Sequence, residues 1–460
     1  MEVNNFKINP EIFHAYDIRG VYQENLSEKS AYLIGRAFSV FLKQLYGSSD
    51  AVLRVVVGRD NRLSSQSLRD NLVQGIIEEG IDVIDIGLAP TPVFYFAVAH
   101  YHYDGGIMIT ASHNPGQYNG FKVVGRGAEP ISEANGLKDI LDTIQAGLGR
   151  TEGVSRGTVE AGLRLKVLED YVAFNLKEVD RESLKSFKIV IDTANAVSGV
   201  AVAEIFKNLP CKIIHIFKEG DGSFPNHDPD PLVERNLESL KLEVKKQKAD
   251  FGVAFDGDGD RIFFVSEKGE TVNGSTIAAF LSKSVLKNHP GEKILYDIRS
   301  SLAVSEAIKE NGGVPIIYRV GHSFIKGKMR KDGIIFGSEI SGHYYHALHY
   351  FCEAPFFVLF EVMRGLQGFS FSQKFAPYQR YYHSGEINLK IADKKAAIGL
   401  LKKQYADGQA TEIDGLRVDF ADWWFLARAS NTEPVLRLII EAKTKELMEE
   451  KKAELLALLD

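Results

Sequence analysis

Apolar runs and amphipathic helical segments alternate along most of this chain. Residues 51–57 (AVLRVVV) and 81–87 (IDVIDIG) are β-rich, and the segment between them places apolar side chains at helical spacing. A strand, a helix and a strand in this order predict parallel strands joined by a right-handed crossover. The same order recurs in residues 188–255 and 293–337. The pattern therefore predicts three α/β domains with mixed, largely parallel sheets.

The end of the chain follows another pattern. A strand and a helix are followed by a turn at Ile413–Gly415, two β-rich runs and a terminal helix from about Thr444. This order predicts a smaller α+β domain. At roughly 150 residues per domain the 460 residues suggest about three domains, and the distinct C-terminal pattern raises the expected number to four. We expect the domains to cover residues 1–155, 156–255, 256–370 and 371–460.

Charge and composition exclude several classes of protein. The 61 acidic and 55 basic residues give a net charge of −6, which indicates neither a nucleic acid nor an anionic membrane as a partner. Cys211 and Cys352 form no C-x-x-C pair, which favours a reducing compartment. The uncharged apolar run Ala354–Phe360 is far shorter than the ~20 residues of a membrane span, and the first residues do not resemble a signal peptide. We expect a cytoplasmic protein, and nothing in the sequence indicates an obligate protein partner.

A first polar loop directly follows a β-rich run. Residues 107–122 (IMITASHNPGQYNGFK) contain Ser112, His113 and Lys122. In open α/β sheets, ligands bind beyond the carboxyl ends of the strands. A serine in such a place can act as a nucleophile when a base, a metal or a covalent modification assists it, and His113 and Lys122 offer a base and a cation. The alternative is an ordinary polar turn, because Ser, Asn, Pro and Gly favour turns.

The second polar loop, DGDGDR, presents carboxylates at alternate positions. Asp256, Asp258 and Asp260 are oxygen ligands of the kind that a hard divalent cation prefers. An EF-hand is disfavoured, because Arg261 stands where that loop needs glycine and the flanking segments are β-rich. A plain turn is disfavoured because three neighbouring carboxylates repel one another unless a cation neutralises them. The loop predicts a metal site, with Mg²⁺ as the favoured ion.

A third loop, GSEISGH, has the composition of a sugar-binding segment. Glu339 and Ser341 are spaced to face one hydroxyl-rich ligand. His322 and His343 lie close by in the sequence and are candidates for phosphate binding or proton transfer. The alternative is that both are structural histidines.

A fourth loop and an N-terminal turn each carry an arginine. Arg428 lies beside small hydrogen-bonding residues in ARASNTEP, a combination that suits a phosphate oxyanion, although a capped turn is equally consistent with it. Arg19 lies at a turn after a short aromatic run, FHAYDIRG.

Taken in order, the segments YDIRG, TASHNP, DGDGDR, GSEISGH and RASNTEP resemble the α-D-phosphohexomutase superfamily over nearly the whole chain. The resemblance implies four domains around a central cleft, each supplying one loop. It implies that a phosphoserine donates its phosphoryl group to a hexose 1-phosphate, and that the resulting hexose 1,6-bisphosphate turns round before it returns its 1-phosphate. A phosphosugar is then the substrate, Mg²⁺ the cofactor, and hexose 1,6-bisphosphate the activator.

The resemblance also implies roles for individual residues. Ser112 matches the phosphoserine and would bind Mg²⁺ together with Asp256, Asp258 and Asp260. Positions that stabilise charge or transfer protons correspond to Arg19, Lys122, Arg261 and His343. Substrate-binding positions correspond to Arg319, His322, Glu339, Ser341, Arg428, Ser430, Asn431 and Thr432.

The form of the third loop bears on the choice of sugar. Its Glu-x-Ser-Gly-His pattern is similar to that of members acting on glucose and mannose phosphates. Contacts at O3 and O4 would tolerate either epimer at C2, so the resemblance implies activity on both sugars. The alternatives are a phosphoglucosamine mutase, a catalytically silent phosphosugar-binding protein and a phosphatase that uses the same serine. Two features depart from many relatives: Arg319 replaces a lysine, and residues 350–357 (YFCEAPFF) lack paired aspartates, which concerns local packing and helix capping.

Overall fold

The computed structural model describes residues 7–47, 52–149, 153–177, 179, 184–207, 209–429 and 435–459. Two compact units make up the chain. Unit 1 comprises Met1–Val272 and Ser341–Ser372, and unit 2 comprises Asn273–Ile340 and Gln373–Asp460. In the part of the chain with assigned structure, no helix has both the length and the apolar character needed to span a membrane.

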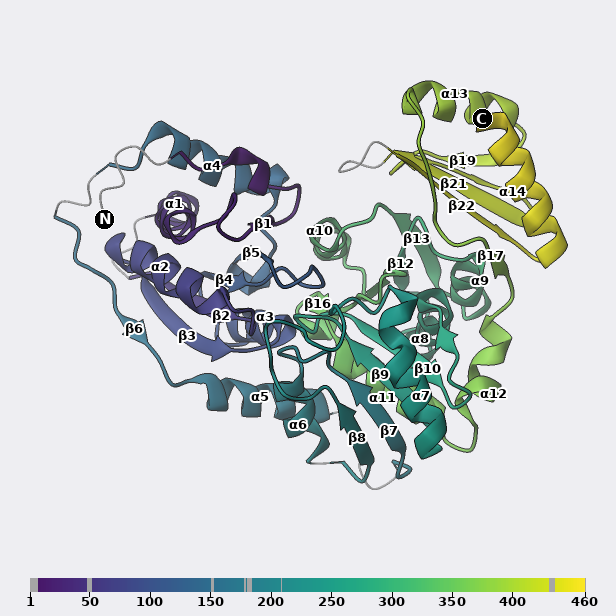
Figure 1. Cartoon of the computed structure of the whole chain (residues 1–460), viewed down its shortest axis with the longest axis horizontal. Helices are drawn as coiled ribbons and strands as arrows, with labels where there is room; N and C mark the ends of the chain where they lie inside the picture. The colour runs from purple at the N-terminus through teal and green to yellow at the C-terminus, as the bar shows by residue number, and fades with distance from the viewer. Residues whose placement is uncertain are drawn as a thin grey trace. The chain divides into compact units, whose positions relative to one another are not determined.

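A mixed six-stranded sheet forms the first part of unit 1 (Figure 1). Its strand order is β1-β5-β4-β2-β3-β6, and the strands from β4 to β6 run parallel. The sheet includes β6, so it extends beyond the boundary expected at residue 155. Its elements are β1 (Ile18–Val21), α1 (Glu28–Tyr46), β2 (Arg54–Arg59), α2 (Ser65–Glu78), β3 (Asp82–Leu88), α3 (Thr91–His100), β4 (Gly105–Ile109), β5 (Tyr118–Gly125), α4 (Leu137–Ala146) and β6 (Val159–Glu160).

Helices α1 and α2 cross with their backbones in direct contact. A Cβ atom added to Gly35 would lie 2.3 Å from the Leu72 carbonyl oxygen, and one added to Gly75 would lie 2.2 Å from the Tyr32 oxygen. Only glycine permits this approach at either position. The close crossing brings the apolar faces of both helices into one core with β2 and β4.

The second sheet of unit 1 carries the aspartate loop. Its strand order is β11-β10-β9-β7-β8, and β9 and β10 form an antiparallel hairpin around DGDGDR. The boundary expected at residue 255 therefore cuts through this hairpin. The loop returns the chain so that β10 pairs with β9, and the last strand of the sheet ends at Val272. The elements are α5 (Arg164–Leu176), β7 (Lys188–Asp192), α6 (Gly199–Phe206), β8 (Lys212–Ile216), α7 (Glu238–Gln247), β9 (Phe251–Phe255), β10 (Ile262–Ser266) and β11 (Thr271–Val272).

The segment Ser341–Ser372 adds a hairpin and a helix to unit 1. Strands β15 (Tyr344–His346) and β16 (Cys352–Glu353) pair antiparallel, and α11 (Pro355–Gly365) follows. Proline occupies the start of α11, and the preceding Ala354 makes no capping bond through its side chain. Proline is well suited to the first turn of a helix, so this helix begins without the capping carboxylate that the sequence lacks.

Unit 2 contains three parallel strands of the third sheet and the fourth domain. Strands β13, β12 and β14 are parallel, with β12 in the middle. The elements of this part are α8 (Gly274–Asn288), β12 (Lys293–Asp297), α9 (Leu302–Glu310), β13 (Val314–Tyr318), α10 (His322–Asp332) and β14 (Phe336–Ser338), and α12 (Phe371–Phe375) lies at the later junction of the two units.

The fourth domain is an antiparallel sheet with two helices, as the sequence predicts. Arg417 on β20 is buried and donates hydrogen bonds to the carbonyl oxygens of Ile298 (2.7 Å) and Ser300 (2.8 Å), which joins this sheet to the third one. The elements are β17 (Tyr382–His383), β18 (Ile387–Leu389), α13 (Lys394–Gln404), β19 (Gln409–Thr411), β20 (Leu416–Asp419), β21 (Trp423–Ala429), β22 (Leu436–Ala442) and α14 (Lys445–Leu459).

Candidate active site

Ser112 lies just beyond the carboxyl end of β4, where the sequence predicts the nucleophile. Its hydroxyl donates a hydrogen bond to Asp256 Oδ2 at 2.7 Å, and its Oγ is 3.3 Å from His113 Nδ1. Burial and the nearby cations Arg261 and Arg19 hold the pKa of His113 well below its usual value, so this imidazole is neutral near pH 7. The serine is therefore positioned between a carboxylate and a neutral base.

The three aspartates of the β9–β10 loop converge on the same place. Asp256, Asp258 and Asp260 are each at most 1 % exposed, and one carboxylate oxygen of each lies within 4.8 Å of the others. Lys122 on β5 donates to Asp258 Oδ2 at 2.7 Å and also to Asp260 Oδ2. Two loops of unit 1 that lie far apart in sequence thus form one cluster.

The electrostatics of the cluster fit a bound cation. Burial, followed by the charges of Asp260 and Asp258, raises the pKa of Asp256 to about 8. Burial alone would also raise the pKa of Asp260, but Lys122, His343 and Arg261 hold it well below its usual range. Within the described residues, the buried Asp258 Oδ1 has no hydrogen-bond partner. A compact set of carboxylate oxygens with a spare buried acceptor is suited to a hard divalent ion.

Arg261 and His343 complete one side of the cluster. His343 Nε2 lies 3.3 Å from Asp260 Oδ1, and Arg261 Nε lies 3.2 Å from the same imidazole nitrogen. Ser341 Oγ is 3.0 Å from His343 Nδ1. These residues, predicted from two separate loops, are therefore in contact with each other and with the aspartates.

Arg19 approaches the serine loop from β1. Its guanidinium donates to Asn114 Oδ1 at 2.7 Å and forms an ion pair with Asp17. The predicted residues of unit 1 that form this single neighbourhood are Arg19, Ser112, His113, Lys122, Asp256, Asp258, Asp260, Arg261, Ser341 and His343.

The remaining predicted residues with described positions belong to unit 2. Glu339 is 2 % exposed, accepts a hydrogen bond from the Gly321 amide at 3.0 Å and lies 3.7 Å from Arg299. Arg299 is itself paired with Asp297 at 2.8 Å. These contacts hold the Glu339 carboxylate in a fixed place at the end of β14.

Arg319, His322 and Arg428 also belong to unit 2. The guanidinium of Arg319 stacks 3.9 Å from the ring centroid of Phe324, and His322 begins α10. Arg428 on β21 is 3.5 Å from Asp414, which also accepts a hydrogen bond from the Val320 amide. Asp414 thus connects the arginine of the fourth loop to the segment that precedes α10. Ser430, Asn431 and Thr432 lie outside the described residues.

The structure adds residues that the sequence did not single out. Thr91 donates a hydrogen bond to Asp258 Oδ2 at 2.6 Å, and Asn114 Oδ1 accepts one from the Arg19 guanidinium. Glu353 is buried, with a carboxylate oxygen within 4.8 Å of the ligand atoms of Asp260 and His343. A signal for Glu353 was present in the sequence, because it is the one acidic residue in the otherwise apolar segment YFCEAPFF. Thr91 and Asn114 had no such signal.

Models of known protein families match most of this chain. Family models described as phosphoglucomutase/phosphomannomutase domains I, II, III and C-terminal match residues 10–148, 169–269, 273–354 and 386–458. A phosphomannomutase of Vibrio cholerae is 37% identical over 97% of this chain and 98% of its own. A phosphomannomutase/phosphoglucomutase of Pseudomonas aeruginosa is 36% identical over 95% of this chain and 93% of its own.

A solved structure shows the same fold throughout. The phosphoglucomutase/phosphomannomutase family protein of Burkholderia thailandensis is 31% identical and superposes with a TM-score of 0.89 over 98% of both chains. Together with the four matched domains, this confirms the four-domain α/β architecture and the resemblance noted in the motifs. The chain belongs to the phosphoglucomutase/phosphomannomutase family of the α-D-phosphohexomutase superfamily.

Proposed function

We propose that this phosphohexomutase interconverts the 1- and 6-phosphates of mannose and glucose through a phosphoserine at Ser112 and a hexose 1,6-bisphosphate. The observation that carries the proposal is the position of Ser112. Its Oγ is 2.7 Å from Asp256, beside two further buried carboxylates and the ammonium of Lys122. Mannose and glucose are favoured because relatives over nearly the full length bear phosphomannomutase and phosphoglucomutase names.

In the proposed reaction, a sugar hydroxyl attacks the phosphorus of phosphorylated Ser112. The new O–P bond forms as the bond to Ser112 Oγ breaks, and the hydroxyl proton passes to a base of the site. The bisphosphate then turns round and returns its other phosphoryl group to Ser112 Oγ, which leaves the isomeric monophosphate. Positioning and electrostatics supply most of the catalysis in such transfers.

The residues of unit 1 divide this work. Asp256, Asp258 and Asp260, with the phosphoserine, would hold Mg²⁺, which when bound would offset negative charge at the transferring phosphoryl group. Lys122, Arg19 and Arg261 provide further cations, and His113, Lys122 and His343 are the candidates for proton transfer. Hexose 1,6-bisphosphate would serve as the activator that phosphorylates Ser112 before the first turnover.

The residues of unit 2 would recognise the sugar phosphate. Glu339 would bind a ring hydroxyl, and Arg319 and His322 would assist. Ser341 of unit 1 is likewise proposed to bind a ring hydroxyl. Arg428, with the neighbouring Ser430, Asn431 and Thr432, would bind the phosphate that does not react. The boundary expected near residue 370 and a cytoplasmic location are also part of this proposal.

The test is a mutase assay on glucose, mannose and glucosamine 1-phosphates with Mg²⁺ and a catalytic amount of hexose 1,6-bisphosphate. Comparable turnover of the first two supports the proposal, whereas activity on the glucosamine compound alone would overturn the substrate. Free phosphate released in proportion to substrate would indicate a phosphatase. Absence of turnover, with no phosphate on Ser112 after incubation with glucose 1,6-bisphosphate, would indicate a binding protein.

Asp258→Asn tests the metal site. Loss of one anionic ligand should raise the Mg²⁺ concentration for half-maximal turnover by about 10- to 100-fold or more, since even changes around a metal's ligands have effects of that size. Asp192→Asn is a matched control, because Asp192 is equally buried but pairs with His227. An unchanged Mg²⁺ titration in the Asp258 variant would contradict the assignment.

A further inference from the structure

Arg62, in the loop between β2 and α2, has a fully buried guanidinium that no step of the proposed reaction uses. Its side chain is 0% exposed and pairs with Asp60, whose Oδ2 is 3.0 Å from Arg62 Nε. Asp60 Oδ1 in turn accepts from the Arg62 amide at 3.0 Å and from Ser65 Oγ at 2.5 Å. The planar face of Arg62 lies 5.1 Å from the ring centroid of Phe224. These contacts fix both the position and the plane of the guanidinium.

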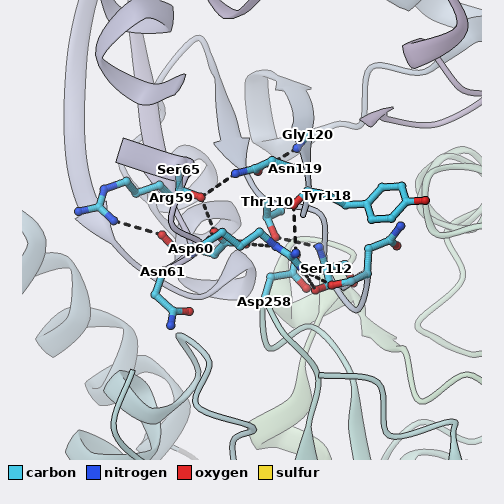
Figure 2. A network of polar contacts seen from close by, with 12 residues as sticks. Arg59, Asp60, Asn61, Ser65, Thr110, Ser112, Tyr118, Asn119, Gly120 and Asp258 are labelled. Carbon is cyan, nitrogen blue, oxygen red and sulfur yellow. Dashed lines mark hydrogen bonds and ion pairs between the residues drawn. The ribbon is translucent and has the colours of Figure 1, made fainter. Parts of the chain in front are cut away.

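The outer nitrogens of Arg62 all point at one target, the main chain of the serine loop. One nitrogen donates to the carbonyl oxygens of Ser112 at 2.7 Å and Asn114 at 2.6 Å. The other donates to the carbonyl oxygens of Pro115 at 2.7 Å and Tyr118 at 3.1 Å. Figure 2 shows this network around Asp60, Ser112 and Tyr118. A single side chain thus binds the loop at four places within seven residues.

The backbone conformation of Ser112 explains why the loop needs these hydrogen bonds from Arg62. Its φ is +50°, in the left-handed region that residues with a Cβ rarely adopt. Its amide donates to Thr110 Oγ1 at 2.9 Å, and its carbonyl accepts from Arg62. With both sides of the residue held in this way, its Oγ is directed to Asp256. Relaxation of the peptide toward ordinary φ values would turn the hydroxyl away from the carboxylate.

We propose that Arg62 is a positioning residue, which holds the Ser112 peptide in its left-handed conformation and so aims the hydroxyl at the aspartate cluster. The inference deepens the proposed function and rests on Ser112 as the group that carries the phosphoryl. A lysine cannot replace this arginine. Its ammonium is a single donor centre, whereas the two outer nitrogens of the guanidinium each reach two carbonyl oxygens of the loop. Arg62 acts through the main chain and need not touch the substrate.

Arg62→Lys tests the proposal. We expect kcat for glucose 1-phosphate, and the rate at which glucose 1,6-bisphosphate phosphorylates Ser112, to fall together by about 100-fold, as for a small displacement of a reacting group. The KM should change by less than about threefold, since unit 2 residues rather than Ser112 would provide sugar recognition. Intact-mass spectrometry follows the phosphorylation. Asp60→Asn keeps the side-chain shape but removes the charge that pairs with Arg62, so it should cause a smaller loss of kcat. This variant replaces Arg62→Lys in the test if Arg62→Lys does not fold.

Arg36→Lys is the matched control. Arg36 is also largely buried, pairs with Glu79 and donates to a carbonyl, that of Gly149 at 2.7 Å, but it lies away from the serine loop. It should lose stability without losing kcat. The positioning role would be overturned if kcat fell equally in Arg62→Lys and Arg36→Lys. It would also be overturned if folded Arg62→Lys kept a kcat within about threefold of the unsubstituted enzyme.

Hydrogen exchange separates this inference from the proposed function. Peptides that cover residues 110–120 should exchange faster in Arg62→Lys than in the unsubstituted protein, whereas peptides from α2 should not. This readout needs no activity, so it still decides the matter if the unsubstituted protein neither turns over nor becomes phosphorylated. Unchanged protection of the loop would overturn the inference whatever the fate of the proposed reaction.

Discussion

Ser112→Ala is expected to abolish mutase turnover, with a loss in kcat on the order of 10⁴-fold or more, the scale seen when a nucleophilic serine is removed. Serine and alanine both carry a Cβ, so the substitution adds no steric cost at the left-handed φ of +50°, and the variant should fold like the unsubstituted protein. Without Oγ, no atom of this residue can carry the phosphoryl group. Turnover with glucose 1-phosphate and intact mass after incubation with glucose 1,6-bisphosphate measure the two consequences.

Ser39→Ala provides the control for this prediction. Ser39 is a buried serine of α1 in the same domain, and its hydroxyl donates to the Gly35 carbonyl oxygen at 2.9 Å. Its removal should leave kcat unchanged. Activity of the Ser112 variant within a few-fold of the unsubstituted enzyme would exclude the covalent mechanism, and phosphorylation at another residue would transfer the role to that residue.

Lys122→Met should produce the second large effect, a loss of stability that Mg²⁺ partly reverses. Lys122 is 4% exposed and donates to Asp258 and Asp260. Removing one partner from a buried charge pair typically costs about 3–5 kcal/mol, because the remaining charge has no compensation. A divalent cation at the aspartates would supply that compensation. The urea midpoint in EDTA should therefore fall strongly, and Mg²⁺ should raise it more in the variant than in the unsubstituted protein.

Lys138→Met is the corresponding control, since Lys138 pairs with Asp142 on an exposed helical face. Exposed pairs contribute little to stability, so its urea midpoint should hardly move, with or without Mg²⁺. A Lys122 variant as stable in EDTA as this control would show that the aspartates need no buried cation. Equal effects of Mg²⁺ on both variants would contradict binding of the ion at the triplet.

Much of the fold could be predicted from local sequence patterns. A serine directly before an amphipathic segment is typical of a helix N-cap, and the hydroxyl of Ser27 accepts the Ser30 amide at the start of α1. The β-rich runs KIVID and FGVAF form β7 and β9. Such features depend on residues within a few positions of each other, which is why periodicity and capping signals find them.

Features that depend on distant residues could not be predicted in the same way. The hairpin β9–β10 crosses an expected domain boundary, because strand pairing and not the break in pattern determines where the sheet ends. Lys122 and Asp258 are 136 positions apart, and Thr91 and Asp258 are 167 apart. Single motifs identified Ser112 and the aspartates, whereas their partners come from other loops and only the folded chain brings them together.

The glycine crossing of α1 and α2 bears on how substitution scans of this enzyme should be interpreted. Gly35 and Gly75 tolerate no side chain, yet they lie in helices that contribute no residue to the phosphoryl-transfer site. A survey that scores only mutase activity in cell extracts would rank substitutions at both glycines as damaging as those at Ser112. Scoring protein abundance alongside activity would separate them, because a bulkier residue at the crossing would lower the amount of folded protein, whereas Ser112→Ala should leave that amount unchanged and remove only the activity.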